Sequence, residues 1–248
     1  MMKKFLKRTC RTAGYRVERW RPANRFDAMS DALELLQLRG FHPRVVIDAG
    51  ANVGDWTRKA LDVFPEAAVH LIEPQPACQP ALERLARTSS SLTVHPVALT
   101  EPGRHSLPFT GGAHYGGTGV HVAMPQEPDI ELECPATTLD DLFGGRVTRA
   151  DRPLLKLDLE GHELSALRGA LALLDVIEVL VVEVQLYDIN SSGVTPVFRD
   201  VFGFLADHGF QLYDVASTGW RRRDMRMHMM DPVFARADSP LCADQSWL

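Results

Sequence analysis

The sequence contains no CxxC pair and no cysteine and histidine residues at the spacing of a structural zinc site. Its few cysteines lie far apart along the chain, at Cys10, Cys78, Cys134 and Cys242. This usage favours a reducing compartment, and we expect a cytoplasmic protein. The longest strongly apolar run, residues 176–184, is interrupted by Glu178 and Glu183 and is too short to span a bilayer. These absences argue against a zinc-binding domain, a disulfide framework and a membrane-spanning protein.

Acidic residues are almost absent from the first 25 residues, which contain nine Lys or Arg and only Glu18. This segment carries a net charge of +8 against −13 for the remainder. Its longest apolar stretch is the pair Phe5 and Leu6, so we do not expect a signal peptide. A packed or solvated terminal helix is the favoured interpretation. Peripheral membrane contact through residues 1–25 is the second hypothesis.

The 248 residues, 45% of them apolar and 24% charged, fit one α/β domain. We expect this domain over residues 44–248. Residues 1–43 would form a basic segment followed by a helix, residues 27–39, that packs on the domain. Gly40 supplies a C-cap for that helix.

Short β-branched runs alternate with helical patterns through much of the chain, which predicts a mostly parallel sheet. The expected strands cover residues 44–50, 68–74, 92–99, 153–161 and 177–185. The expected helices cover residues 54–64, 76–87, 163–174 and 196–208.

Residues 100–135 break this alternation, and we expect an inserted region of antiparallel strands there. The glycine-rich segment 111–119 has the composition of a lid over a site, or of a hairpin end without function, and contains His114 and Tyr115. Near the C-terminus, strands at 210–215 and 230–236 predict an antiparallel pair at the sheet edge. The segment 217–224 between them, which includes Trp220 and three arginines, is interpreted as an exposed turn.

Ligands of open parallel sheets lie beyond the carboxyl ends of the strands, which directs attention to residues 48–54. Gly50 and Gly54 allow the backbone to turn tightly and approach a ligand, and the helix that follows favours an anionic group such as a carboxylate. A dinucleotide fingerprint would have glycine at the position of Asn52, which weakens a nicotinamide or flavin interpretation.

Glu73 ends the second expected strand, 19 residues beyond Gly54. A carboxylate at that position can accept hydrogen bonds from both hydroxyls of a ribose. Together with the glycine turn, it indicates a ligand that contains adenosine. In the structural alternative, Asp48 and Glu73 only cap turns of an ordinary α/β protein.

A third polar cluster lies in KLDLEGHE, residues 156–163, with Asp158 at the expected strand tip. Asp158 and Glu183, at the tip of the next strand, would hold a divalent cation such as Mg²⁺ or share protons. Glu160 and Glu163 have a simpler interpretation, because acidic side chains are favourable in the first turn of a helix.

Several of these segments resemble the FkbM family of methyltransferases: DAGANVGDW, IEPQP, TTLDDLF, LLKLDLEGHELSALRGA and DPVFAR. The similarity runs from about residue 44 to 237, and the order of the motifs is more specific than any one of them. The resemblance implies a Rossmann-like methyltransferase fold, to which the pattern of the chain adds an antiparallel edge and an inserted β-hairpin region. It also implies S-adenosylmethionine as methyl donor and transfer to a hydroxyl of a sugar, glycan or natural product.

By this resemblance, the cofactor contacts fall on three segments. The methionine end would contact Asp48, Gly50, Ala51, Asn52 and Gly54; the ribose would contact Glu73; and the adenine surroundings would include Pro74 and Ala98. Asp158 and His162 would face the acceptor, although the family commonly has a small residue at the position of His162. These two residues and His114 are the catalytic candidates.

Two other classes of protein remain as alternatives. A non-catalytic protein of the same fold would bind an adenosine ligand or support an assembly, but it would not need Glu73, Asp158 and Glu183 together. Nucleic-acid methylation is disfavoured, because the net charge is −5 and no basic patch with aromatic residues occurs outside the N-terminal segment. The acceptor is therefore expected to be a small molecule or glycan. The oligomeric state is not predicted.

Overall fold

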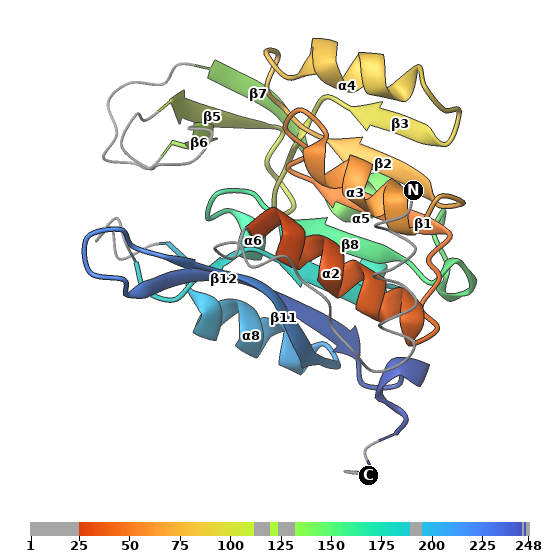
Figure 1. Ribbon diagram of the computed structural model, residues 1–248. Coiled ribbons are helices and arrows are strands. Elements are labelled where there is room, and N and C mark those ends of the chain that lie inside the picture. Colours follow the sequence, from red (N-terminus) through yellow and green to blue (C-terminus); the bar gives the residue numbers. More distant parts are fainter. Residues whose placement is uncertain (1–24, 112–119, 124–131, 189–194, 245, 247–248) are drawn as a thin grey trace.

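The computed structural model describes residues 25–111, 120–123, 132–188, 195–244 and 246. Its main feature is an eight-stranded, mostly parallel sheet with helices against both faces, beside a smaller sheet (Figure 1). Five parallel strands extend from β9 to the β3 edge of the large sheet: β1 (Val45–Ala49), β2 (Ala68–Ile72), β3 (Leu92–His95), β8 (Leu154–Leu157) and β9 (Val179–Val182).

The pairings beyond β9 are antiparallel, which confirms the predicted mixed sheet. They are β10 (Val184–Gln185), β11 (Phe210–Trp220) and β12 (Met227–Arg236). The order is β10-β12-β9-β8-β1-β2-β3, and β11 also pairs with β12. A strand that comes late in the chain therefore lies next to β9, inside the sheet.

Alternate residues of each strand point to opposite faces of the sheet. Because buried apolar side chains lie on both faces, helices cover both. Leu154 of β8 packs in a core with α2 (Arg25–Leu38) and α3 (Asp55–Val63), whereas Leu155 packs with helices of the other face. Those helices are α5 (Leu139–Phe143), α6 (Glu163–Arg168), α7 (Leu171–Leu174) and α8 (Phe198–Asp207). Helix α4 (Gln79–Ala86) packs beside β3, and two short 3-10 helices, η1 (Arg149–Asp151) and η2 (Pro240–Cys242), complete the elements. Within the described ranges, no helix is long and apolar enough to cross a membrane.

The inserted region forms a sheet of its own, with the order β4-β7-β5-β6. Its strands are β4 (Ala98–Leu99), β5 (Ser106–Gly111), β6 (Val120–Val122) and β7 (Leu132–Thr137). The prediction of one strand over residues 92–99 is therefore wrong. Pro96 has no N–H group for a ladder, and the chain leaves the large sheet after His95 and enters the small one at Ala98.

Other boundaries also differ from prediction, and the strand expected over residues 153–161 ends at Leu157. The helix expected over residues 163–174 is interrupted at Gly169, whose Cβ, if present, would lie 2.2 Å from the Thr100 carbonyl oxygen. The strand expected over residues 177–185 is divided at Glu183: pairing with β8 ends at Val182, whereas pairing with β12 extends from β9 into β10. The turn expected at 217–224 begins later, because β11 continues to Trp220.

Candidate active site

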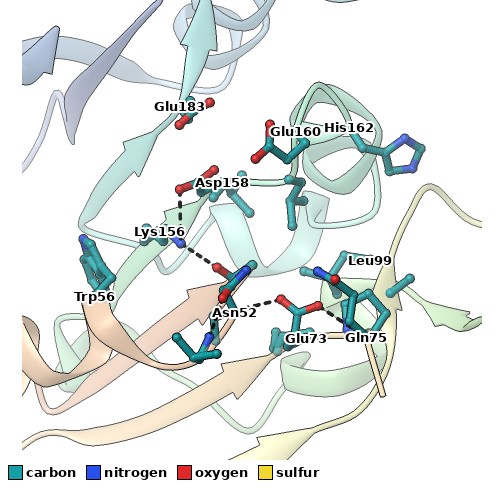
Figure 2. A pocket seen from close by; sticks show the side chains of 18 of the residues that line it. Asn52, Trp56, Glu73, Gln75, Leu99, Lys156, Asp158, Glu160, His162 and Glu183 are labelled. Carbon is teal, nitrogen blue, oxygen red and sulfur yellow. Dashed lines mark hydrogen bonds and ion pairs between the residues drawn. The ribbon is translucent and has the colours of Figure 1, made fainter. Parts of the chain in front are cut away.

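A cavity of about 520 Å³ lies at the carboxyl ends of the parallel strands (Figure 2). It extends from the ends of β2 and the small sheet, across β1 and β8, to β9 and β12. Nine of the residues selected from the sequence line it: Gly50, Ala51, Asn52, Glu73, Pro74, Ala98, Asp158, His162 and Glu183.

The glycine turn closes one wall of this cavity by close backbone packing. Gly50 and Gly54 have φ angles of 79° and 84°, in the left-handed region that favours glycine. A Cβ on Gly50 would lie 1.9 Å from the carbonyl oxygen of Asp158, so the turn after β1 fits against the end of β8 only without a side chain. The Gly50 N–H donates to the Ile72 carbonyl at 2.9 Å, which joins the same turn to β2.

Glu73 is fixed at the end of β2, and only 3% of it is exposed. One carboxylate oxygen accepts the Asn52 backbone N–H at 2.9 Å, and the other accepts the Gln75 backbone N–H at 3.0 Å (Figure 2). Burial raises the pKa of the Glu73 carboxyl, although the two backbone N–H groups oppose this rise. Glu73 therefore holds the glycine turn in place and presents its remaining lone pairs to the cavity.

Asp48 and Gly54 were predicted to contact a ligand, but neither lines the cavity. The completely buried Asp48 carboxylate accepts the Thr57 hydroxyl at 2.5 Å and forms an ion pair with Lys156 at 3.1 Å. Asp48 therefore lies beneath the turn. Its position fits a role in supporting the residues that do line the cavity.

Lys156 is a central residue of the site that the sequence did not single out. Its ammonium donates to the Gly50 carbonyl at 2.9 Å and lies 3.6 Å from Asp158 (Figure 2). Burial lowers the pKa of Lys156, but the charges of Asp48, Asp158 and Glu183 outweigh burial and raise that pKa to about 12. The ammonium is therefore charged at neutral pH and neutralises part of an otherwise acidic wall.

The predicted divalent cation finds no support in the geometry. Among the residues that the structure describes, no group of three or more His, Cys, Asp or Glu side chains could hold a metal ion. Asp158 instead forms an ion pair with Lys156, so a side-chain cation already lies beside this carboxylate.

The turn after β8 presents a histidine to the cavity and buries a glutamate. A His162 ring nitrogen lies 3.3 Å from the Thr100 hydroxyl, and burial together with the nearby Arg104 lowers the pKa of His162 to about 4. Glu163 is buried at the start of α6 and accepts the backbone N–H groups of Leu159 and Gly161. Burial raises the pKa of Glu163 to about 7. Glu163 thus supports the turn, whereas the exposed Glu160 lines the cavity.

The β12 end of the cavity contains residues that sequence reasoning missed. They are Met29, Trp56, Val181 and Asp231, beside Glu183. Trp56 is 8% exposed, and its indole Nε1 has no hydrogen-bond partner among the described residues. The buried Asp231 accepts the Ser217 hydroxyl. Asp231 and Trp56 both belong to motifs quoted from the sequence, but the sequence pattern gave no reason to place either one in the cavity.

The predicted site also includes His114, which lies outside the described residues, as does most of the glycine-rich segment 111–119. Its proposed contact with the acceptor stays a prediction.

The topological features place the chain in a definite class: a mostly parallel α/β sheet, a glycine turn after β1, and an acidic residue at the end of β2 facing a cavity. This is a Rossmann-like domain with a site suited to an adenosine-containing ligand. The chain belongs to the FkbM methyltransferase family, because the model of the methyltransferase FkbM domain matches residues 48–212. It is therefore a methyltransferase.

Solved structures with similarity to this chain include two methyltransferases and a fibrillarin. Precorrin-6y C5,15-methyltransferase from Geobacter metallireducens is 14% identical, with a TM-score of 0.43, over 83% of this chain and 86% of its own. 1,6-didemethyltoxoflavin-N1-methyltransferase from Burkholderia thailandensis is 14% identical, with a TM-score of 0.46, over 84% of this chain and 78% of its own. Aeropyrum pernix fibrillarin, in complex with S-adenosyl-L-methionine, is 12% identical, with a TM-score of 0.44, over 84% of this chain and 76% of its own. No curated protein sequence matches this one significantly.

Proposed function

We propose that the protein transfers a methyl group from S-adenosylmethionine to a hydroxyl oxygen of a sugar, glycan or natural product. The observation that carries this proposal is Glu73, a buried carboxylate at the end of β2 that is fixed against the glycine turn and lines the cavity. A carboxylate in this position is suited to accept both ribose hydroxyls of an adenosine ligand.

The residues present fit this cofactor at both ends. Glu73 would bind the ribose, and Ala98 and Leu99 would border the adenine, since both line the β2 end of the cavity. At the other end, the Trp56 indole N–H, which has no partner among the described residues, would donate to the methionine carboxylate. A buried N–H group without an acceptor is costly, and a ligand oxygen would remove that cost. When bound, S-adenosylmethionine supplies a methyl group on a positively charged sulfur.

Asp158 is the first candidate to accept the proton of an acceptor hydroxyl. It follows the end of β8, lines the cavity, and is oriented by its ion pair with Lys156. His162 is the second candidate. Its pKa of about 4 leaves the ring neutral near pH 7, so a ring nitrogen is available to accept a proton. The larger contribution would come from aligning the acceptor oxygen with the methyl group in a site from which water is excluded.

Cofactor binding is tested by calorimetry with S-adenosylmethionine and S-adenosylhomocysteine on the wild type and Glu73→Ala. We expect micromolar binding to the wild type and a loss of at least tenfold in the variant, because hydrogen bonds to a charged group contribute about 1.5–3 kcal/mol. Glu83→Ala, on the exposed side of α4, is the matched control. Failure of folded wild-type protein to bind either compound would favour the non-catalytic alternative.

Catalysis is tested by incubating the protein with S-adenosylmethionine and a panel of sugars and glycans, and by measuring the release of S-adenosylhomocysteine. For an accepted substrate, Asp158→Ala should lose about 100-fold or more in turnover and keep a folded structure. NMR of the product identifies the methylated atom. Near wild-type turnover would remove Asp158 from the mechanism, and a methyl group on nitrogen would overturn the proposed oxygen acceptor.

A further inference from the structure

The turn of the β11–β12 hairpin projects from the same edge of the sheet as the candidate active site. β12 pairs antiparallel with β9, with Val233 opposite Val181 and Ala235 opposite Val179. Residues 221–226, which precede β12, therefore lie beyond the carboxyl end of β9. Figure 1 shows this hairpin extending well past α8.

The hairpin turn exposes two large apolar side chains. Met225 is 68% exposed, the most among the large hydrophobic residues that the structure describes, and Trp220 is 45% exposed. Trp220 is paired across the hairpin with Met227, so the aromatic ring lies where the turn begins. An exposed tryptophan and methionine on a projecting turn indicate an interaction surface.

The same turn is strongly basic. Residues 221–226 contain four arginines and one acidic residue, Asp224, in a chain with a net charge of −5. Two of the arginines are held by the fold: the guanidinium groups of Arg221 and Arg226 lie 5.4 and 3.9 Å from the centre of the Tyr187 ring. Arg221 also forms an ion pair with Asp224. These contacts fix the shape of the turn.

The remaining two arginines, Arg222 and Arg223, are exposed at the end of the hairpin, and Arg223 lies 3.8 Å from the Asp224 carboxylate. The turn therefore combines fixed geometry, exposed cations and exposed apolar side chains within seven residues, 220–226. Soluble polyanions would bind the cations but would give no environment for Trp220 and Met225. An anionic membrane surface accommodates both, since tryptophan favours the lipid interface and arginine the anionic headgroups.

We propose that the hairpin turn, residues 220–226, docks the protein on an anionic lipid bilayer. Trp220 and Met225 enter the interface, and Arg222 and Arg223 contact the headgroup phosphates. Because the turn extends from the edge that contains the cavity, docking brings the active site close to the lipid surface. If the proposed methyl transfer holds, acceptors attached to lipids are then the class best placed to reach it.

The test is co-sedimentation of the full chain with vesicles of phosphatidylcholine alone and of phosphatidylcholine with about one third phosphatidylglycerol. Each basic residue near such a surface contributes about a fivefold gain in affinity, so Arg222→Gln with Arg223→Gln should lower affinity for the anionic vesicles by roughly 30-fold. Trp220→Ala with Met225→Ala should also weaken binding to them. We expect weak binding to phosphatidylcholine alone.

Matched controls separate this surface from others. Leu171→Ala removes a side chain that is 49% exposed on α7, and Arg199→Gln removes an exposed cation on α8; neither should change vesicle binding. In a further full-length variant, Lys3, Lys4, Lys7 and Arg8 are replaced by Gln. Binding that depends only on these four residues, or no binding of the wild type, would overturn the proposal.

A third outcome would also contradict the proposal. In it, the arginine variant loses binding to vesicles and to soluble heparin equally, and the Trp220 and Met225 substitutions have no effect. That result would assign the turn to soluble polyanions. Calorimetry with S-adenosylhomocysteine on each variant keeps the question of docking separate from that of the methyl-donor site.

Discussion

The Lys156 ammonium lies 3.1 Å from the Asp48 carboxylate, and both side chains are almost completely buried. The pair joins the end of β1 to β8 beneath the glycine turn, and the same ammonium donates to the Gly50 carbonyl. One buried cation thus contacts three parts of the cavity wall: Asp48, the Gly50 carbonyl and Asp158.

Replacing Lys156 by Met should lower the free energy of unfolding by about 3–5 kcal/mol, because it leaves the Asp48 carboxylate buried without its cation. The measurement is urea unfolding. The double variant Lys156→Met with Asp48→Asn, which removes both charges, should recover part of this loss. Equal or greater instability of the double variant would show that the ion pair is not the cause.

Gly50→Ala should destabilise the fold by more than 3 kcal/mol, or prevent folding, because it combines a positive φ with an overlap against the Asp158 carbonyl. Gly103→Ala is the matched control, since Gly103 has a φ of 88° and open space around its Cβ position. The control should lose only about 1–2 kcal/mol. Similar thermal unfolding of the two variants would contradict the close packing of the turn on β8.

Trp56→Phe tests the indole N–H while keeping an aromatic ring. If this donor binds the methionine carboxylate, affinity for S-adenosylhomocysteine should fall about tenfold or more. Affinity for 5′-methylthioadenosine, which lacks that carboxylate, should stay the same. Calorimetry with both ligands gives the comparison, and an equal loss for the two would assign Trp56 to packing alone.

Glu163 should make stability depend on pH. Its pKa in the folded protein is about 7, above the ordinary value of 4.5, so the folded state holds a proton that the unfolded state releases as pH rises. Stability is lost as pH increases from about 4.5 to 7. At 1.36 kcal/mol per pKa unit, the free energy of unfolding of Glu163→Gln, relative to that of the wild type, should rise by about 3 kcal/mol from pH 4 to pH 8. Urea unfolding at the two pH values checks this, and a constant difference would exclude Glu163 as the titrating group.

Much of the central sheet and the β2 side of the site could be predicted from the sequence. Strand and helix periodicities identify β1, α3 and β2, and the ends of parallel strands meet at one edge, so Gly50 and Glu73 could be placed near each other. The family resemblance, confirmed by the domain match, adds the methyltransferase activity.

The β12 side was less accessible to sequence reasoning, for physical reasons. The sequence gives no sign that Lys156 belongs to the site, because a buried lysine needs carboxylates from other strands around it and no local pattern shows them. Asp231 reaches the cavity only because β12 pairs with β9, a contact between distant parts of the chain that no local pattern specifies. Likewise, the break at Gly169 depends on its contact with the Thr100 carbonyl.

The position of β12 also sets an order of assembly during synthesis. β9 leaves the ribosome about fifty residues before β12, yet it pairs with β12 along the edge that β8 leaves open. Until β12 emerges, the nascent chain presents an unpaired strand edge and a cavity that lacks the wall containing Asp231. A newly made chain can therefore contain the complete FkbM domain match and still have no finished active site.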